Sequence, residues 1–190
     1  MTVEMFERAI ASTKTVLANV EPDQLDATTP CQSWKVRDLI NHFVGGNYFF
    51  AAVAKTGSPP SGGGGERDFT GDDISAAYAA GGAEAVGAFK APGVMEKTLK
   101  LPFGELPGSA FVMIAASDAF VHGWDLARAT GQPTADLDPE LAEQLLAFAR
   151  DAIPDQFRGA DTTAPFGPKV DVPADAPAAD RLAGFMGRQV

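Results

Sequence analysis

The sequence predicts an all-α protein that folds as a single domain over residues 1–190. Five stretches carry apolar residues at every third or fourth position, which is the period of an amphipathic helix. One of them, residues 111–131, is apolar with few interruptions, and Gly131 followed by Pro133 is typical of a helix end. With 190 residues, 45% of them hydrophobic, the chain can bury one core of ordinary size and is too short to presume two.

The first two helices are expected over residues 3–19 and from Ser33 to about Lys55. Turn-forming residues at 21–23 stop the first helix. Serine is a common helix N-cap, so Ser33 is expected to cap the second helix with Trp34 just inside it. The buried face of the second helix has helical spacing and comprises Val36, Leu39, Ile40, Phe43, Val44 and Tyr48.

Residues 57–65 include four consecutive glycines and are expected to form a flexible loop. A phosphate-binding loop would need a Gly-Lys-Ser/Thr ending or a preceding strand, and the sequence has neither, so we interpret this loop as a rim. A third helix is expected from Asp72 or Asp73 to about Lys90. Its Gly81-Gly82 pair weakens the helix and favours close packing against a neighbour.

The chain between the third and fourth helices is turn-rich. Residues 98–101 are expected to be extended, and the fourth helix to start near Ser109. Pro139 fits the first turn of a fifth helix from about Asp138 to Ala152. Residues 154–179 are rich in proline with little periodicity, so they should wrap irregularly over the other helices before a short last helix at 179–186.

Composition and charge exclude several classes of protein. A formal net charge of −10 and a pI near 4.5 would repel phosphate backbones, so nucleic-acid binding is not expected. The most apolar helix carries Asp118, His122, Asp125 and Arg128, so no membrane span is expected. The N-terminus lacks the basic start and apolar core of a signal peptide, and Cys31 is the single cysteine; both indicate a cytoplasmic protein.

Three ionisable residues interrupt the apolar side of the fourth helix. At 100° per residue, Asp118, His122 and Asp125 fall within roughly 60° of one another. Burial of an unpaired carboxylate is costly, and a divalent cation is one way to satisfy it. Residues four apart can converge on one ion. Alternatively, one aspartate fixes the tautomer of His122 through a hydrogen bond, or this face lines a wet crevice.

The second of the two histidines favours the metal. His42 lies on the expected second helix, beside Gly45 and Gly46, which leave open volume next to the imidazole. If His42 packs against His122 and Asp118, two imidazoles and one carboxylate meet at one point. Such a donor set suits several divalent metals.

The chain resembles the DinB-like superfamily, and within it actinobacterial proteins related to the metal-binding domain of mycothiol-dependent maleylpyruvate isomerase. The resemblance spans nearly the whole chain. Four segments carry it: residues 29–42 (TPCQSWKVRDLINH), 101–104 (LPFG), 118–131 (DAFVHGWDLARATG) and 180–188 (DRLAGFMGR). It implies an up-down four-helix bundle, to which the expected fifth helix and irregular tail are additions.

The resemblance also implies a metal site and a chemistry. His42, Asp118 and His122 would be the ligands of a divalent metal, zinc or nickel. Many relatives have Glu or His where this chain has Asp118, which is one methylene shorter than Glu, so Asp118 either binds directly or holds a metal-bound water. The bound metal would acidify a small thiol such as mycothiol, which then attacks a small electrophile, in a thiol transferase or isomerase. The chain looks too short to include the extra C-terminal domain of the isomerase.

Other readings of the sequence stay open. The alternative function is a non-catalytic protein that binds a metal or a small ligand, as a monomer or a homodimer. Asp125 is either an acceptor that orients a histidine or a partner of Arg128 or of the region around Trp34. Trp34 and Trp124 are expected in the core, and Cys31 as a small buried filler or as a reactive thiol near a helix start.

Overall fold

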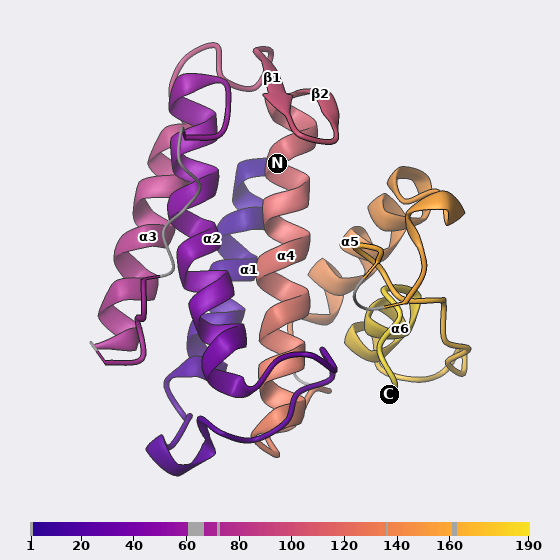
Figure 1. Cartoon of the computed structure of the whole chain (residues 1–190). Helices are drawn as coiled ribbons and strands as arrows, with labels where there is room; N and C mark the ends of the chain where they lie inside the picture. Colours follow the sequence, from indigo (N-terminus) through magenta and orange to yellow (C-terminus); the bar gives the residue numbers. More distant parts are fainter. Residues whose placement is uncertain (1, 61–66, 72, 136, 161–162) are drawn as a thin grey trace.

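The structure, a computed structural model, describes residues 2–60, 67–71, 73–135, 137–160 and 163–190. Four long helices lie side by side as a bundle (Figure 1): α1 (Thr2–Leu17), α2 (Val36–Thr56), α3 (Ile74–Phe89) and α4 (Gly108–Ala129). Each of α1 and α2 packs against both α3 and α4. The expected all-α four-helix bundle is therefore confirmed.

The directions of the helices refine the expected up-down order. In Figure 1, α1 and α4 run one way, and α2 and α3 run the other way. The contacts agree: Thr13 of α1 bonds Ala119 of α4, and Gln132 just after α4 bonds Val16 near the end of α1. Parallel neighbours need a long connection, and residues 57–73 supply it between α2 and α3.

The second helix begins later than its sequence predicted. Its N-cap is Lys35, so the prediction of Ser33 as the cap is wrong. The backbone N–H of Lys35 donates to the carboxylate of Asp38 at 2.9 Å, and the N–H of Val36 donates to the carbonyl of Ala27 at 3.0 Å. An isolated bridge also pairs Thr28 with Lys35. These bonds hold the preceding segment in a loop and delay the helix start.

The third helix packs as closely as its glycines predicted. A Cβ at Gly81 would lie 3.0 Å from Tyr48 Cε2, and one at Gly82 would lie 3.1 Å from Ile10 Cγ2. Glycine thus lets α3 approach both α2 and α1. Asp73 is its N-cap, with the carboxylate accepting from Ala76 N at 2.9 Å, whereas Asp72 and most of the glycine-rich loop lie outside the described residues.

A two-stranded hairpin leads into α4. The expected extended piece is β1 (Thr98–Leu101), which pairs antiparallel with β2 (Gly104–Pro107). The second strand was not predicted, because residues 102–108 read as turns. Helix α4 starts at Gly108 and ends as expected, since Gly131 takes φ +69°, the left-handed conformation that closes a helix.

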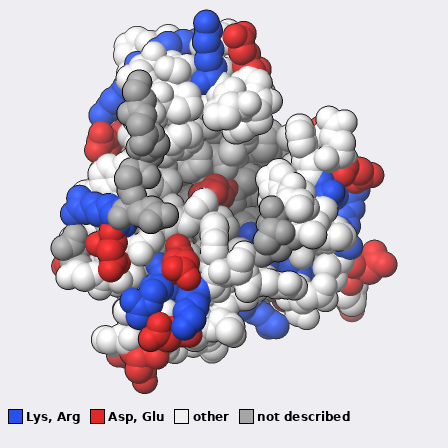
Figure 2. All heavy atoms as spheres, viewed as in Figure 1, with Lys and Arg blue, Asp and Glu red and all other residues white. Residues whose placement is uncertain are grey.

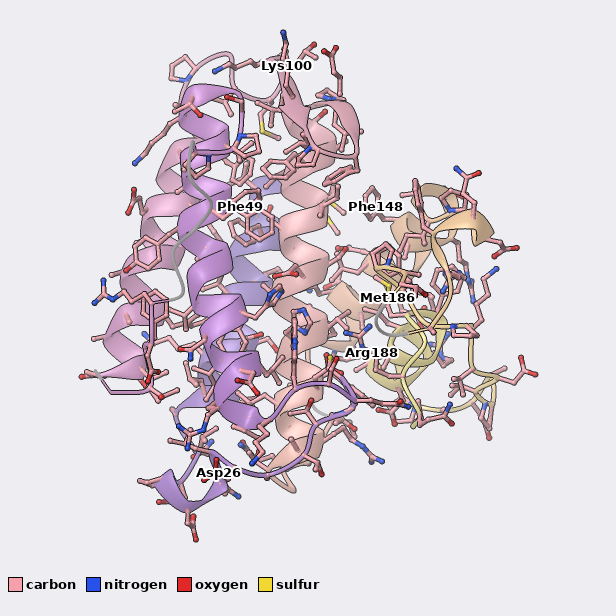
Figure 3. All side chains as sticks on the ribbon, in the orientation of Figure 1. Asp26, Phe49, Lys100, Phe148, Met186 and Arg188 are labelled. Atoms are coloured by element: carbon pink, nitrogen blue, oxygen red, sulfur yellow. The ribbon has the colours of Figure 1, made fainter. Side chains whose placement is uncertain are left out.

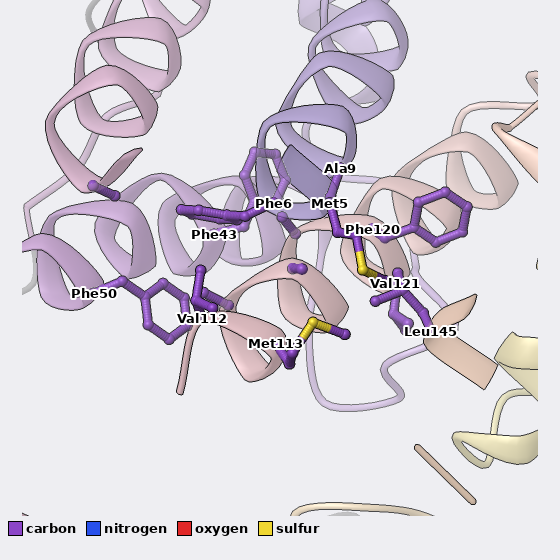
Figure 4. Close-up of a cluster of buried hydrophobic side chains, with 14 of the residues drawn as sticks. Met5, Phe6, Ala9, Phe43, Phe50, Val112, Met113, Phe120, Val121 and Leu145 are labelled. Carbon is purple, nitrogen blue, oxygen red and sulfur yellow. The ribbon is translucent and has the colours of Figure 1, made fainter. Parts of the chain in front are cut away.

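Helix α4 lies at the centre of the core. Figure 4 shows Phe6 of α1, Phe43 of α2 and Val112 of α4 in one buried cluster, with Leu145 bringing in α5 (Pro139–Ala152). The last helix, α6 (Ala178–Phe185), packs on α5 and α4. Two short 3-10 turns, η1 (Pro22–Gln24) and η2 (Asp155–Phe157), lie in the connections. The fifth helix, the irregular tail and the last helix match the expectation.

Among the helices of the described part of the chain, none is both long and apolar enough to cross a membrane.

Candidate metal centre

His42, Asp118 and His122 come together between α2 and α4. The Oδ1 atom of Asp118 lies 3.5 Å from Nε2 of His42 and 3.5 Å from Nε2 of His122. The two imidazole rings are 4.8 Å apart between centroids and nearly perpendicular, at 80°. The sequence predicted that one residue of the second helix would lie beside an i, i+4 pair of the fourth. The structure brings all three residues together.

The spacing of the three donor atoms suits one small cation. Their mutual distances are all within 4.8 Å. Two ligand atoms bound at about 2.0–2.1 Å in tetrahedral geometry lie about 3.3 Å apart. The two distances of 3.5 Å from Asp118 are already close to that value. The residues therefore fit a divalent metal with little rearrangement.

The centre is open on one side. Side-chain exposure rises from 10% for His122 through 23% for Asp118 to 40% for His42. Figure 2 shows an acidic side chain deep in a hollow on the face where α2 and α4 run side by side. Gly46 lies beside the carboxylate of Asp118, because a Cβ there would lie 3.6 Å from Asp118 Oδ2. The expected open volume beside the two glycines is not found, because a Cβ at Gly45 would meet Phe69 Cε2 at 3.7 Å and one at Gly46 would also meet Phe50 Cε2 at 3.7 Å.

Trp34 forms a wall of the centre. Its ring centroid lies 4.5 Å from that of His42 and 5.8 Å from that of His122, and its side chain is half-buried. We expected Trp34 in the core; it packs against the edge of the core and also on both imidazoles, from the loop before α2. Trp124 is in the core as expected, and its Nε1 donates to Asp180 of α6 at 2.7 Å.

Asp125 supports His122 from the buried side. The Nδ1 atom of His122 lies 2.9 Å from Oδ2 of Asp125, which is fully buried. Arg188, in the tail after α6, donates to both carboxylate oxygens of Asp125, at 3.2 and 3.0 Å. The thiol of Cys31 donates to the same carboxylate at 3.3 Å. Asp125 was expected either to orient a histidine or to pair with Arg128 or with the region around Trp34. The structure shows its contact with His122, and Arg128 lies over the Trp124 ring instead.

Sequence reasoning missed Arg188. Its segment, residues 180–188, was recognised as a family-like motif, but no spacing connects it to the fourth helix. Cys31 was expected as a filler or a reactive thiol, and it packs between Asp125 and Arg188, with Arg188 Nη2 3.5 Å from its sulfur. A buried aspartate in an apolar helix signals a cationic partner, but the sequence does not say which of the arginines supplies it.

At Asp118, His122 and Asp125, the neighbouring charges and hydrogen bonds together shift the pKa more than burial does. Burial disfavours the carboxylate of Asp118, yet His122 and His42 hold the pKa of Asp118 below its ordinary value. Burial likewise opposes the charged form of His122, but Asp118 and Asp125 raise the pKa of His122 well above its ordinary value. Asp125 is buried too, and Arg188 with His122 lowers the pKa of Asp125. These pairings favour the charged forms of His122 and of both carboxylates.

A second group of potential ligands shares His122. It consists of Cys31, His122 and Asp125, and it lies on the Nδ1 side of the imidazole. Arg188 is in direct contact with both Cys31 and Asp125. A guanidinium at this distance repels a metal cation, so this group is better suited to holding the arginine.

The fold and the clustered histidines and aspartate define a helical-bundle protein of the DinB-like class. The family model for the mycothiol maleylpyruvate isomerase N-terminal domain matches residues 6–127. The chain belongs to this family. The match ends within α4, so α5, α6 and Arg188 lie beyond it.

Two curated relatives are similar along their whole length. They are the uncharacterized proteins MT0763 and Rv0738 of Mycobacterium tuberculosis, each 45% identical over 184 residues, which is 97% of this chain and 96% of theirs. The crystal structure of the mycothiol-dependent maleylpyruvate isomerase has a TM-score of 0.60 at 15% identity, and that of a mutant has 0.61 at 14%. The similarity covers 77% of this chain and 66% of each isomerase chain, just under two thirds. At this identity it shows the shared fold.

Proposed function

We propose that the chain binds one divalent metal ion, zinc or nickel, through His42, Asp118 and His122. We further propose that it acts on a small electrophile with a low-molecular-weight thiol of the mycothiol type, as a thiol transferase or isomerase. Family membership supports the class of thiol, since the solved relative is named a mycothiol-dependent isomerase.

The observation that carries the proposal is the open three-donor cluster. Three protein ligands are typical of catalytic metal sites, in which a further position is left for water or substrate. Here the exposed side of the cluster, at His42 with 40% exposure, is where such a molecule would enter. A bound metal would supply Lewis acidity, which lowers the pKa of a thiol or water that it binds.

The residues around the cluster have distinct tasks. Asp118 brings negative charge that offsets the cation, and His122 is held by Asp125 so that Nε2 faces the metal position. The Trp34 ring covers both imidazoles and keeps water from one side of them. The thiol and the electrophile would then meet on the exposed side of the cluster, at His42.

Two measurements test the proposal. Protein purified without added metal should contain close to one equivalent of zinc or nickel by elemental analysis, and His42→Ala and His122→Ala should lose it. If both variants kept stoichiometric metal, the ligand assignment would be wrong. A screen of small thiols against a panel of electrophiles should then show transfer by the wild type that Asp118→Asn reduces, since the metal charge would be less well balanced.

A second candidate function is structural: the metal would only hold α2 and α4 together. It is favoured by the origin of the donors, because His42 belongs to α2 and the other two to α4. A tying ion predicts that chelation loosens the α2–α4 contact and lowers helical content. The catalytic proposal predicts that the metal-free protein keeps its helical circular dichroism, because Phe50 and Phe111 already pack these helices together, with ring centroids 5.4 Å apart.

A further inference from the structure

We propose that Arg188 is a positioning residue for the metal centre: it fixes Asp125, which in turn fixes the ring of His122. The C-terminal tail would thereby set the affinity of a site built from α2 and α4. This inference rests on the proposed metal function and assigns a role to a residue beyond the part of the chain that the family model matches.

The first contact in this chain of residues is between His122 and Asp125. They are three residues apart on α4, and Nδ1 lies 2.9 Å from Oδ2. Because Nδ1 is engaged by Asp125, Nε2 is the nitrogen that faces Asp118. A carboxylate behind a ligating histidine fixes both its tautomer and its ring orientation, and the loss of such a partner commonly weakens metal binding.

The second contact is between Asp125 and Arg188. The Asp125 side chain is fully buried, so its charge needs compensation from within the protein. Arg188 Nε and Nη2 reach its two oxygens at 3.2 and 3.0 Å, as a two-pronged contact that a lysine cannot reproduce. Within the described chain, Arg188 is the one cationic side chain besides His122 that contacts Asp125.

The tail is shaped to deliver this arginine. Gly187 has φ +91°, and its backbone packs on that of Gly167, so a side chain there would collide. The N–H of Arg188 donates to the carbonyl of Ala183 at 3.0 Å, and its Nη1 donates to that of Met186 at 3.1 Å. Figure 3 shows Arg188 between the tail and α4. The turn therefore fixes both the backbone and the guanidinium.

The test compares metal affinity in Arg188→Met, Arg188→Lys and the control Arg181→Met, each as the full chain. Arg181 lies on α6, just before this tail, and contacts Glu143 and the carbonyl of Ala176. Affinity for Co²⁺ is measured by competition with a chromophoric chelator, and the visible Co²⁺ spectrum reports the geometry of the donors. We expect a loss of about 10- to 100-fold for Arg188→Met, a smaller loss for Arg188→Lys, and less than about threefold for Arg181→Met.

A double variant separates positioning from general damage to the fold. If Arg188 acts through Asp125, then Arg188→Met in an Asp125→Asn background should weaken Co²⁺ binding by less than about threefold further. Circular dichroism identifies variants that fail to fold. If Arg188→Met fails to fold, the Co²⁺ affinities of Arg188→Lys and Asp125→Asn are compared instead. Weaker Co²⁺ binding in both supports the positioning role, and wild-type affinity in both contradicts it.

The outcomes distinguish the two proposals. A wild-type chain that binds no Co²⁺, Zn²⁺ or Ni²⁺ overturns the proposed function itself. A wild-type chain that binds Co²⁺, together with folded Arg188 variants of unchanged affinity and spectrum, overturns the positioning role alone. Equal losses in Arg181→Met and Arg188→Met would also overturn it, since they would reflect the docking of the tail rather than the contact with Asp125.

Discussion

The imidazole rings of His42 and His122 lie 4.8 Å apart, although they belong to helices that are separated by α3 and the hairpin in the sequence. Both rings also face Trp34. The fluorescence of Trp34 should therefore be sensitive to an ion bound at the candidate metal centre.

Trp34 emission should report metal binding. Nickel ions quench nearby indoles, and Trp34 lies 4.5 Å from the His42 ring, whereas Trp124 is buried beside Asp180. A Ni²⁺ titration should therefore lower tryptophan fluorescence saturably in the wild type and in Trp124→Phe, but not in Trp34→Phe. Quenching that persisted in Trp34→Phe would place the ion elsewhere.

A larger side chain at Gly46 should close the centre without harming the helix. Leucine is about 0.8–1 kcal/mol better than glycine in a helix interior, so Gly46→Leu should not lower the thermal midpoint. The new side chain would start 3.6 Å from Asp118 Oδ2 and would lie against the donor cluster. We expect metal affinity to fall at least tenfold. Gly87→Leu on α3, where a Cβ meets no atom within 4 Å, is the matched control and should bind as the wild type does.

Gly123→Ala should destabilise the bundle itself. Gly123 follows His122 on α4, and a Cβ there would lie 3.2 Å from Thr13 Cα and closer still to the Thr13 hydroxyl. That hydroxyl donates to the carbonyl of Ala119 at 2.6 Å, so it cannot move freely. Overpacking of this kind costs about 1–3 kcal/mol, measurable by urea unfolding. A variant as stable as the wild type would show that α1 and α4 can separate at little cost.

The pairing of Arg8 with Asp138 predicts a pH dependence of stability. Arg8 donates two hydrogen bonds to this carboxylate, at 2.9 and 2.7 Å, and lowers its pKa in the folded state. Since the folded pKa is the lower one, the stabilisation is present above the unfolded value of about 3.9 and is lost as the pH falls through the folded pKa.

The variant Asp138→Asn isolates this contribution, because asparagine still caps α5. It should be about 1 kcal/mol less stable than the wild type at neutral pH, and the difference should shrink below about pH 4. Urea unfolding across this pH range measures it. Asp175→Asn, at an exposed position, is the control. A difference that stayed constant with pH would mean that the charge of Asp138 contributes nothing.

The helices and the clustering of the three polar residues were predictable because each leaves a local pattern. Periodicity and capping residues located the five longer helices, Gly131 and Pro139 marked ends that the structure confirms, and the i, i+4 spacing put Asp118 and His122 on one face. The pairing of that face with His42 came from there being only two histidines and from the family resemblance. Whether the three residues bind a metal stays a prediction.

The features that were missed depend on contacts between distant segments. Ser33 has the chemistry of a cap, but bonds from Ala27 and Asp38 move the helix start to Val36. The parallel directions of α1 and α4 accompany the parallel directions of α2 and α3, which periodicity does not encode. Arg188 reaches Asp125 across 63 positions of sequence, and no local spacing predicts such a partner.

The order of the helices determines when the cluster can exist during synthesis. A nascent polypeptide that has completed only α1, α2 and α3 presents one imidazole, that of His42, and so offers no chelate to a passing ion. The other two donors arrive together on α4 along with Asp125, and Arg188 arrives last, with the tail. Capture of an ion would thus wait for α4, and a polypeptide that ends before α4 would not chelate metal at this cluster.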